Sequence, residues 1–211
     1  MAKRRRKKYR GTNFLFNRGH LKWKNLFVLL TAFFLVGYGV YELHQIRLEQ
    51  EAREKLPTAK EQFIASVKPE AQAMMQQHHV YASITIAQSI LESNWGKSTL
   101  ASKYYNLFGV KSDDPNNSKV LKTQEYVNGE WITINGRFQL YSSWNESIEE
   151  HAMLMVNGTT YNSAQYADVI SATTYQAAAQ ALQTDGYATD PTYASKIIEI
   201  IQKYKLDQYD S

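Results

Sequence analysis

Residues 82–98 read Ala-Ser-Ile-Thr-Ile-Ala-Gln-Ser-Ile-Leu-Glu-Ser-Asn-Trp-Gly-Lys-Ser. The apolar run from Ile84 to Leu91 predicts a helix that ends at Glu92. Trp95 and Gly96 follow directly. A carboxyl group between an apolar helix end and an indole is poorly hydrated, which raises its pKa. Most helical glutamates are solvated surface residues, but one in this position can stay protonated and act as a general acid.

Helical patterns fill most of the chain beyond residue 58. Thr58 and Ser143 each precede a glutamate by three residues, a spacing that predicts a helix start with a capping box. Ser83 is expected to cap the helix that leads to the glutamate, and Pro69 to lie in the first turn of a separate helix. The other expected helices cover 69–78, 143–157, 174–183 and 191–204.

The middle of this region has a β-rich pattern instead. Two runs of strand formers, 120–127 and 131–134, flank Asn128-Gly129, a dipeptide that strongly favours a hairpin turn. Asn135-Gly136 predicts a second turn, with a third strand over 137–141. The whole pattern indicates an α+β fold, mainly α, with a small β-hairpin lobe inserted among the helices.

The N-terminal part of the chain has a different composition. Residues 1–24 carry ten Lys and Arg and no acid, a net charge of +10; since the whole chain carries +4, the rest carries −6. Residues 25–41 contain no charged side chain. At about 1.5 Å per residue they form a short but adequate span for a hydrocarbon core of about 30 Å. The basic tail predicts a cytoplasmic N-terminus and an external remainder, with a cleaved signal peptide as the alternative.

The expected organisation is a basic cytoplasmic tail (1–24), one transmembrane signal-anchor helix (25–41), a helical stalk or linker (42–57) and the main domain (58–211). The positive charge is confined to a tail beside a membrane segment, which argues against nucleic-acid binding. The chain has no cysteine, and its histidines lack the spacing of a zinc site. We therefore expect no disulfide framework, no metal and no cofactor.

The Glu92 segment resembles the catalytic motif of the peptidoglycan N-acetylglucosaminidases of glycoside hydrolase family 73, the flagellar-type glucosaminidases. The resemblance extends over about residues 58–208. Further blocks that match in order are Asn106-Leu107-Phe108-Gly109-Val110-Lys111, Thr123-Gln124-Glu125-Tyr126, Arg137-Phe138 with Tyr141, Glu146-Ser147-Ile148, Gly186-Tyr187-Ala188-Thr189-Asp190-Pro191, and Tyr193-Ala194. One departure is Glu150-His151, where flagellar-type members commonly have Asp-Tyr.

The resemblance implies a lysozyme-like helical domain with the hairpin lobe across a cleft. It also implies an endo-β-N-acetylglucosaminidase that cleaves the β-1,4 bond on the reducing side of N-acetylglucosamine in peptidoglycan glycan strands. Together with the predicted topology, this places the domain outside the cell membrane, facing the cell wall.

Three residues are expected to carry the chemistry. Glu92 is the candidate general acid. Glu125 matches the family's second glutamate, and on a strand it shares one face with Leu121 and Thr123. Tyr187 matches a tyrosine of the family's active site, where its hydroxyl can bind the acetamido group or stabilise positive charge. Each also has a plain structural reading, Glu125 as an exposed strand charge and Tyr187 as a packed turn anchor.

The mechanism is left open by the sequence. Carboxyl groups about 6.5–9.5 Å apart imply inversion, and about 5–5.5 Å a covalent retaining route. A third route uses the substrate's own 2-acetamido oxygen as the nucleophile, which leaves Glu125 to orient or stabilise it.

Aromatic side chains are the candidate sugar-binding residues, because sugar rings present apolar C–H faces to flat rings. Asn106 is a candidate hydrogen-bond partner for the glycan or, equally, a turn cap. The aromatic candidates are Trp95, Phe108, Trp131 and Tyr161, any of which can instead be core.

Two alternatives remain beside the glucosaminidase. A muramidase or lytic transglycosylase on the same scaffold would cut after the muramic acid residue. A non-catalytic wall-binding module would bind wall without releasing sugar, and the presence of Glu92, Glu125 and Tyr187 argues against it.

Overall fold

The computed structural model describes residues 13–17, 20–54, 56–127 and 130–211, with the backbone alone described for 52–54, 124–127 and 131. The chain forms two compact units, Met1–Pro57 and Thr58–Ser211.

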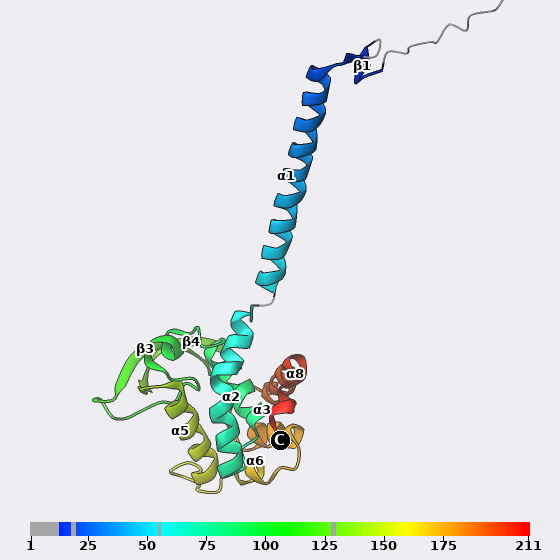
Figure 1. The fold of residues 1–211 in the computed structure, drawn as a ribbon. Helices are drawn as coiled ribbons and strands as arrows, with labels where there is room; N and C mark the ends of the chain where they lie inside the picture. The colour runs from blue at the N-terminus through cyan, green and yellow to red at the C-terminus, as the bar shows by residue number, and fades with distance from the viewer. Residues whose placement is uncertain (1–12, 18–19, 55, 128–129) are drawn as a thin grey trace, which may run out of the picture. The chain divides into compact units, whose positions relative to one another are not determined.

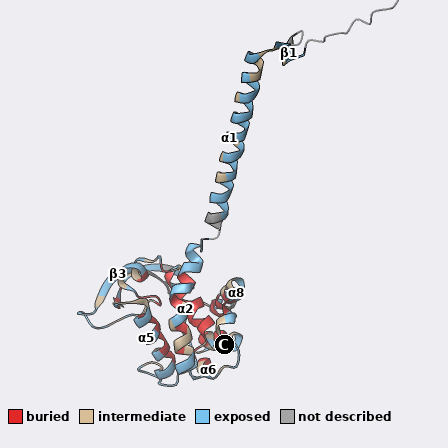
Figure 2. Cartoon of the chain, in the orientation of Figure 1, coloured by how far each residue is buried: buried red, intermediate tan, exposed pale blue. Residues whose placement is uncertain are grey.

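The first unit is dominated by one long helix. A two-residue antiparallel pair, β1 (Phe16–Asn17) and β2 (His20–Leu21), precedes α1 (Trp23–Glu54). The apolar segment and the charged stretch after it thus form a single continuous helix. The part Trp23–Glu51 is long and apolar enough to cross a membrane, and most of its large apolar side chains are exposed (Figure 2). A signal sequence near an N-terminus can meet the same criterion of length and hydropathy.

The second unit is a helical domain with one hairpin (Figure 1). Helices α2 (Ala59–His78), α7 (Tyr175–Thr184) and α8 (Tyr193–Tyr204) pack on α3 (Ala82–Ser93). The hairpin of β3 (Ser118–Val127) and β4 (Glu130–Gln139) follows α4 (Thr99–Tyr104). The elements in chain order are α2 (Ala59–His78), α3 (Ala82–Ser93), α4 (Thr99–Tyr104), β3 (Ser118–Val127), β4 (Glu130–Gln139), α5 (Trp144–Asn157), α6 (Ala167–Ser171), α7 (Tyr175–Thr184), α8 (Tyr193–Tyr204) and the 3₁₀ helix η1 (Leu206–Tyr209).

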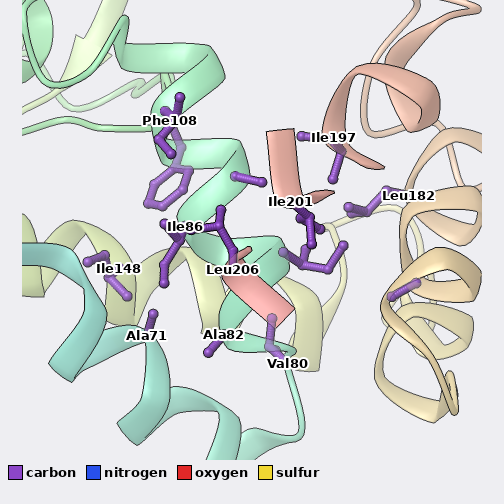
Figure 3. Packing of buried hydrophobic residues seen from close by; sticks show 14 of the residues in the cluster. Ala71, Val80, Ala82, Ile86, Phe108, Ile148, Leu182, Ile197, Ile201 and Leu206 are labelled. Atoms are coloured by element: carbon purple, nitrogen blue, oxygen red, sulfur yellow. The ribbon is translucent and has the colours of Figure 1, made fainter. Parts of the chain in front are cut away.

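Helix α3 is the centre of the core because it is apolar or small on nearly every side. All its residues from Ala82 to Ile90 are buried. Neighbouring helices cover it with aliphatic side chains, among them Ile148 of α5 and Ile197 of α8 (Figure 3). A helix that is buried all round fixes the position of whatever residue stands at its end, and that residue is Glu92.

Local sequence signals explain several helix starts. Thr58 and Glu61 form the predicted capping box of α2, with the Thr58 hydroxyl accepting from Glu61 N and the carboxylate accepting from Thr58 N. The Ser143 hydroxyl accepts from Glu146 N at the start of α5. The Glu146 carboxylate, however, accepts from the backbone and hydroxyl of Ser142. The α5 cap is therefore an N-cap without the reciprocal half of the box.

Two helix predictions were wrong. Pro69 lies inside α2 and does not begin a helix. An interior proline costs about 3 kcal/mol, which the burial of α2 residues on both sides of it, such as Val67 and Ala71, offsets. Ser83 does not cap α3, which starts at Ala82. The Asp210 carboxylate instead accepts from Ser83 N at 2.7 Å, so the C-terminal segment caps this helix.

The hairpin was predicted correctly in its two strands and wrongly beyond them. Strands β3 and β4 pair antiparallel up to Val127 and Glu130, and the predicted turn Asn128-Gly129 lies outside the described residues. Asn135-Gly136 is no turn, since β4 continues through it and no third strand follows. A Cβ on Gly136 would lie 2.9 Å from the Phe138 ring, so this glycine makes room for an aromatic side chain in the strand. The predicted class, mainly α with a small hairpin lobe, is confirmed.

Candidate active site

A left-handed turn fixes Glu92 at the end of α3. Asn94, Trp95 and Gly96 have consecutive positive φ angles of 49°, 62° and 71°. Ser93 secures the turn, because its hydroxyl accepts from Gly96 N at 2.7 Å and donates to the Ser89 carbonyl. Left-handed residues other than glycine are costly, and clusters of them occur at functional sites.

The Glu92 side chain lines a cleft of about 1430 Å³. The end of α3, the segment after α4, the hairpin and the start of α8 all contribute to its walls. Residues far apart in the sequence therefore meet there. The lining residues are Leu91, Glu92, Ser98, Thr99, Leu100, Phe108, Gly109, Lys111, Leu121, Lys122, Thr123, Phe138, Tyr187, Ala188, Thr189, Asp190, Pro191, Tyr193 and Lys196.

The cleft raises the pKa of the Glu92 carboxyl. The side chain is reached by solvent from the cleft, yet the surrounding walls replace much of its bulk water, and this desolvation disfavours the carboxylate. Its place at the C-terminal end of α3, the negative end of the helix dipole, acts in the same direction. The Tyr193 hydroxyl donates to Glu92 Oε1 at 3.0 Å and opposes the shift. Desolvation is the larger effect, so the net direction is upward.

Tyr187 lies in the same cleft. Gly186 precedes it with φ of 79°, a conformation that favours glycine and turns the chain between α7 and α8. The Tyr187 ring contacts those of His151, Tyr166 and Tyr193, with centroids 5.6–6.1 Å apart. Burial, followed by the nearby Glu92 charge, raises its pKa well above the usual value. Its hydroxyl is therefore neutral and able to donate a hydrogen bond.

The hairpin candidates are described only in their backbone. Glu125 pairs with Ile132, and Trp131 pairs with Tyr126. The side chains of Glu125 and Trp131 lie outside the described residues. Leu121 and Thr123 of β3 both line the cleft.

Phe108 is the one binding candidate with a described side chain that lines the cleft. It is buried and stacks on the His151 ring, with centroids 3.9 Å apart and an angle of 10° between the planes. A ring held this way presents only part of its surface to a ligand.

Trp95 and Tyr161 are not among the residues that line the cleft. The indole of Trp95 packs edge-to-face on Tyr204 and Phe63, with Lys60 Nζ 4.8 Å from its centroid. It borders a neighbouring depression, formed largely by α8, which shares the lining residues Leu91 and Lys196 with the cleft. Tyr161 is 98% exposed in the segment after α5. The prediction that these two residues bind substrate stays a prediction.

Asn106 also has a structural position. Its side-chain amide donates to the carbonyls of Val110 and Gln139 at 2.9 Å each, and its oxygen accepts from Val110 N at 3.0 Å. These bonds tie the turn after α4 to β4, so Asn106 shapes the cleft wall from behind and does not face a ligand.

Replacing Asn106 by alanine should destabilise the domain. The change leaves backbone groups of Val110 and Gln139 without partners, which lowers the free energy of unfolding by about 1–3 kcal/mol. Urea denaturation of residues 58–211 measures the loss. Asn116→Ala, at an exposed loop position, is the matched control and should change stability by no more than about 0.5 kcal/mol. Equal effects of the two changes would contradict this role for Asn106.

The sequence reasoning missed Tyr193, the direct partner of Glu92. It stands in the first turn of α8, and the spacing along the chain gives no sign that its hydroxyl reaches a residue 101 positions earlier. The cleft lysines Lys111, Lys122 and Lys196 were missed for the same reason. Among the described residues, no group of three or more His, Cys, Asp or Glu side chains is arranged to hold a metal ion.

Known proteins resemble this chain in sequence and in fold. Residues 68–206 match the glucosaminidase family model, described as mannosyl-glycoprotein endo-beta-N-acetylglucosaminidase. Exo-glucosaminidase LytG of Bacillus subtilis is 49% identical over 148 residues, which cover 70% of this chain and 52% of that protein. A probable N-acetylmuramidase of Lactococcus lactis is 40% identical over 83% of this chain and 41% of its own length. The chain thus spans about half or less of these relatives.

Among solved structures, the catalytic domain of the autolysin Auto from Listeria monocytogenes superposes with a TM-score of 0.68. The two are 39% identical, and the match covers 78% of this chain and 96% of that domain. With the family model spanning most of the helical domain and the hairpin, the chain belongs to the glucosaminidase family of glycoside hydrolases.

Proposed function

We propose that this protein is a peptidoglycan hydrolase that cleaves the β-1,4 bond on the reducing side of N-acetylglucosamine in cell-wall glycan. The observation that carries the proposal is Glu92, a carboxyl group with a raised pKa in a cleft between the helical body and the hairpin. Glycoside hydrolysis requires such an acid to protonate the leaving oxygen. The names of relatives support the substrate class, among them the peptidoglycan hydrolase FlgJ of Escherichia coli.

In this proposal Glu92 protonates the glycosidic oxygen as the bond to the anomeric carbon breaks. Tyr187 stands in the same cleft as a neutral donor and assists by binding the acetamido group or stabilising the developing positive charge. Glu125, on the strand that carries the cleft residues Leu121 and Thr123, acts as base or electrostatic stabiliser. The second carboxylate is thus assigned from the family resemblance and the backbone position of β3.

A muramidase is the second candidate, because the relatives from Lactococcus lactis are named as probable N-acetylmuramidases. The same scaffold and acid would serve either reaction, since the two differ in which sugar occupies the position before the broken bond.

Product analysis separates the candidates. Purified protein is incubated with peptidoglycan, the products are reduced with borohydride, and the reduced sugar is identified by mass spectrometry. We expect reduced N-acetylglucosamine. Reduced muramic acid would indicate a muramidase, anhydromuramic ends a lytic transglycosylase, and no new ends a binding module.

The length of the products tests the endo mode. The family description names an endo enzyme, whereas the Bacillus relative is named an exo-glucosaminidase. An endo enzyme shortens the mean glycan length early in the digestion. An exo enzyme releases small sugars while the mean length hardly changes, and that result would contradict the endo assignment.

We further propose that α1 anchors the protein in the cell membrane, single-pass, with its basic N-terminus in the cytoplasm and the domain facing the wall. The support is the apolar segment Trp23–Glu51 behind a tail of ten basic residues. The full chain should sediment with membranes, withstand a high-salt wash and be released by detergent, with residues 1–57 intact by mass spectrometry. A shortened chain in the medium would indicate a cleaved signal peptide.

Replacing Tyr193 by phenylalanine should change the pH dependence. The Tyr193 hydrogen bond favours the Glu92 carboxylate, so its loss raises the pKa of the acid further. Because a general acid must be protonated, activity falls as the pH rises through this pKa. The basic limb of kcat/KM should therefore move to higher pH in Tyr193→Phe, as measured on soluble glycan fragments. A limb that stays in place or moves to lower pH would contradict the assignment of this limb to Glu92.

A further inference from the structure

A chain of hydrogen bonds runs through the core to Glu92. His151 of α5 contacts Gln88 of α3, with Nε2 2.9 Å from Gln88 Oε1. Gln88 Nε2 donates to the Tyr193 hydroxyl oxygen at 3.0 Å. Tyr193 in turn donates to Glu92 Oε1 at 3.0 Å. The side chains of His151 and Gln88 are buried, so water does not compete for the hydrogen bond between them.

The protonation state of His151 determines which group donates and which accepts in each of these hydrogen bonds. Burial lowers its pKa to about 3, so the ring is neutral and carries one N–H. Gln88 Oε1 can only accept, so the proton is on Nε2. His151 Nδ1 is then an unprotonated acceptor, and no donor to it is found among the described residues. The stacked Phe108 ring, 3.9 Å away, holds the imidazole plane in place.

The orientation of His151 fixes that of the Gln88 amide, which in turn fixes that of the Tyr193 hydroxyl. With its oxygen bonded to His151, the Gln88 amide presents its N–H₂ group to Tyr193. The Tyr193 oxygen accepts that bond, so its single proton is directed at Glu92 Oε1. A carboxyl oxygen that accepts a hydrogen bond is a poor site for the acid's own proton, which is therefore left to Oε2.

We propose that Gln88 and His151 are positioning residues that act through Tyr193 to confine the transferable proton of Glu92 to Oε2. The proposal rests on the proposed role of Glu92 as general acid. Gln88 lies one helical turn before Glu92, so the same buried helix that places the acid also places the residue that orients its proton. The sequence gives no sign of this role, because its members come from α3, α5 and α8.

Other ionisable groups around Glu92 stay unchanged in the test below. They reach the cleft from the segment after α4, from β3, from the segment that leads into α8 and from α8 itself. They are Lys111, Lys122, Tyr187, Asp190 and Lys196.

The test is a double-mutant cycle on the full chain in detergent, with Gln88→Met and Tyr193→Phe alone and together. Methionine fills a similar volume without a donor or acceptor. In Gln88→Met the Tyr193 hydroxyl can turn and accept from Glu92, which stabilises the protonated acid. We expect kcat to fall about ten-fold, part of the 10²–10⁴ that a general acid contributes, with KM within about two-fold and the basic limb at higher pH.

The cycle distinguishes a positioning role from mere packing. In the Tyr193→Phe background Gln88→Met should cause no further loss of kcat and no further shift, because its effect passes through Tyr193. The proposal would be overturned if the two substitutions lowered kcat by independent factors that multiply. It would also be overturned if the basic limb of the pH profile stayed in place in Gln88→Met. His151→Phe, which keeps a ring stacked on Phe108, should show a smaller change in the same direction, and it replaces Gln88→Met in the cycle if that variant does not fold. A wild-type protein that releases no sugar ends would refute the proposed function instead.

Discussion

Glu92→Gln should lower the rate of glycan cleavage by about 10²–10⁴-fold, the usual contribution of a general acid. Glutamine has nearly the same shape, and its side-chain oxygen can still accept from the Tyr193 hydroxyl that lies 3.0 Å from Glu92 Oε1. The amide has no acidic proton for the leaving oxygen. KM should change little, because the cleft walls stay in place. The rate of appearance of new reducing ends on purified peptidoglycan gives the measurement.

The matched control is Glu199→Gln, an exposed glutamate of α8 that borders the neighbouring depression and does not line the cleft. This control should retain activity within about two-fold, as a solvated surface carboxylate away from the reacting atoms has little effect. Both variants should unfold at the temperature of the wild type. Substantial activity in Glu92→Gln, or an equal loss in the control, would remove Glu92 from the proposed role.

Gly96→Ala should cause the largest loss of stability among single changes near the site. Gly96 has φ of +71°, and an added Cβ would lie 2.8 Å from Trp144 and 2.9 Å from Phe63. The left-handed conformation costs about 1–2 kcal/mol for alanine, and overpacking adds about 1–3 kcal/mol. Phe63 and Trp144 cannot easily move, because their rings pack on each other 5.3 Å apart. The free energy of unfolding should therefore fall by about 2–5 kcal/mol in urea denaturation.

Gly109→Ala provides the control for this change. Gly109 has nearly the same φ, +69°, but an added Cβ would meet nothing within 4 Å. It should cost only the conformational part, about 1–2 kcal/mol. The difference between the two variants isolates the steric contact with the aromatic pair. Equal losses would show that the turn after Glu92 is not tightly packed against Phe63 and Trp144.

The sequence predicted the elements whose signals are local. The apolar run before Glu92, the capping box at Thr58 and the two strands around residues 128–129 all depend on neighbours within a few positions. Pro69 misled the prediction because burial along α2 outweighs the local cost of a proline. Asn135-Gly136 misled it because the glycine accommodates the Phe138 ring and makes no turn.

The site was predictable only in part, because some of its contacts join residues that are far apart in the sequence. Glu92 could be found because its environment is set by the helix in which it stands. Tyr193 and His151 could not, since their contacts with Glu92 and Gln88 join residues 101 and 63 positions apart. Trp95 and Asn106 have residue types that suit sugar binding, but tertiary packing uses both for structure. The side chain of Glu125 stays a prediction.

The most direct test of the account is the titration of Glu92 itself. The carboxyl carbon of Glu92 is followed by ¹³C NMR across the pH range in residues 58–211, and its signal is identified by its absence in Glu92→Gln. The cleft predicts a pKa above the ordinary glutamate value of 4.5, because desolvation outweighs the hydrogen bond from Tyr193. A pKa at or below 4.5 would mean that the carboxyl is ionised under working conditions, and would contradict its role as the general acid.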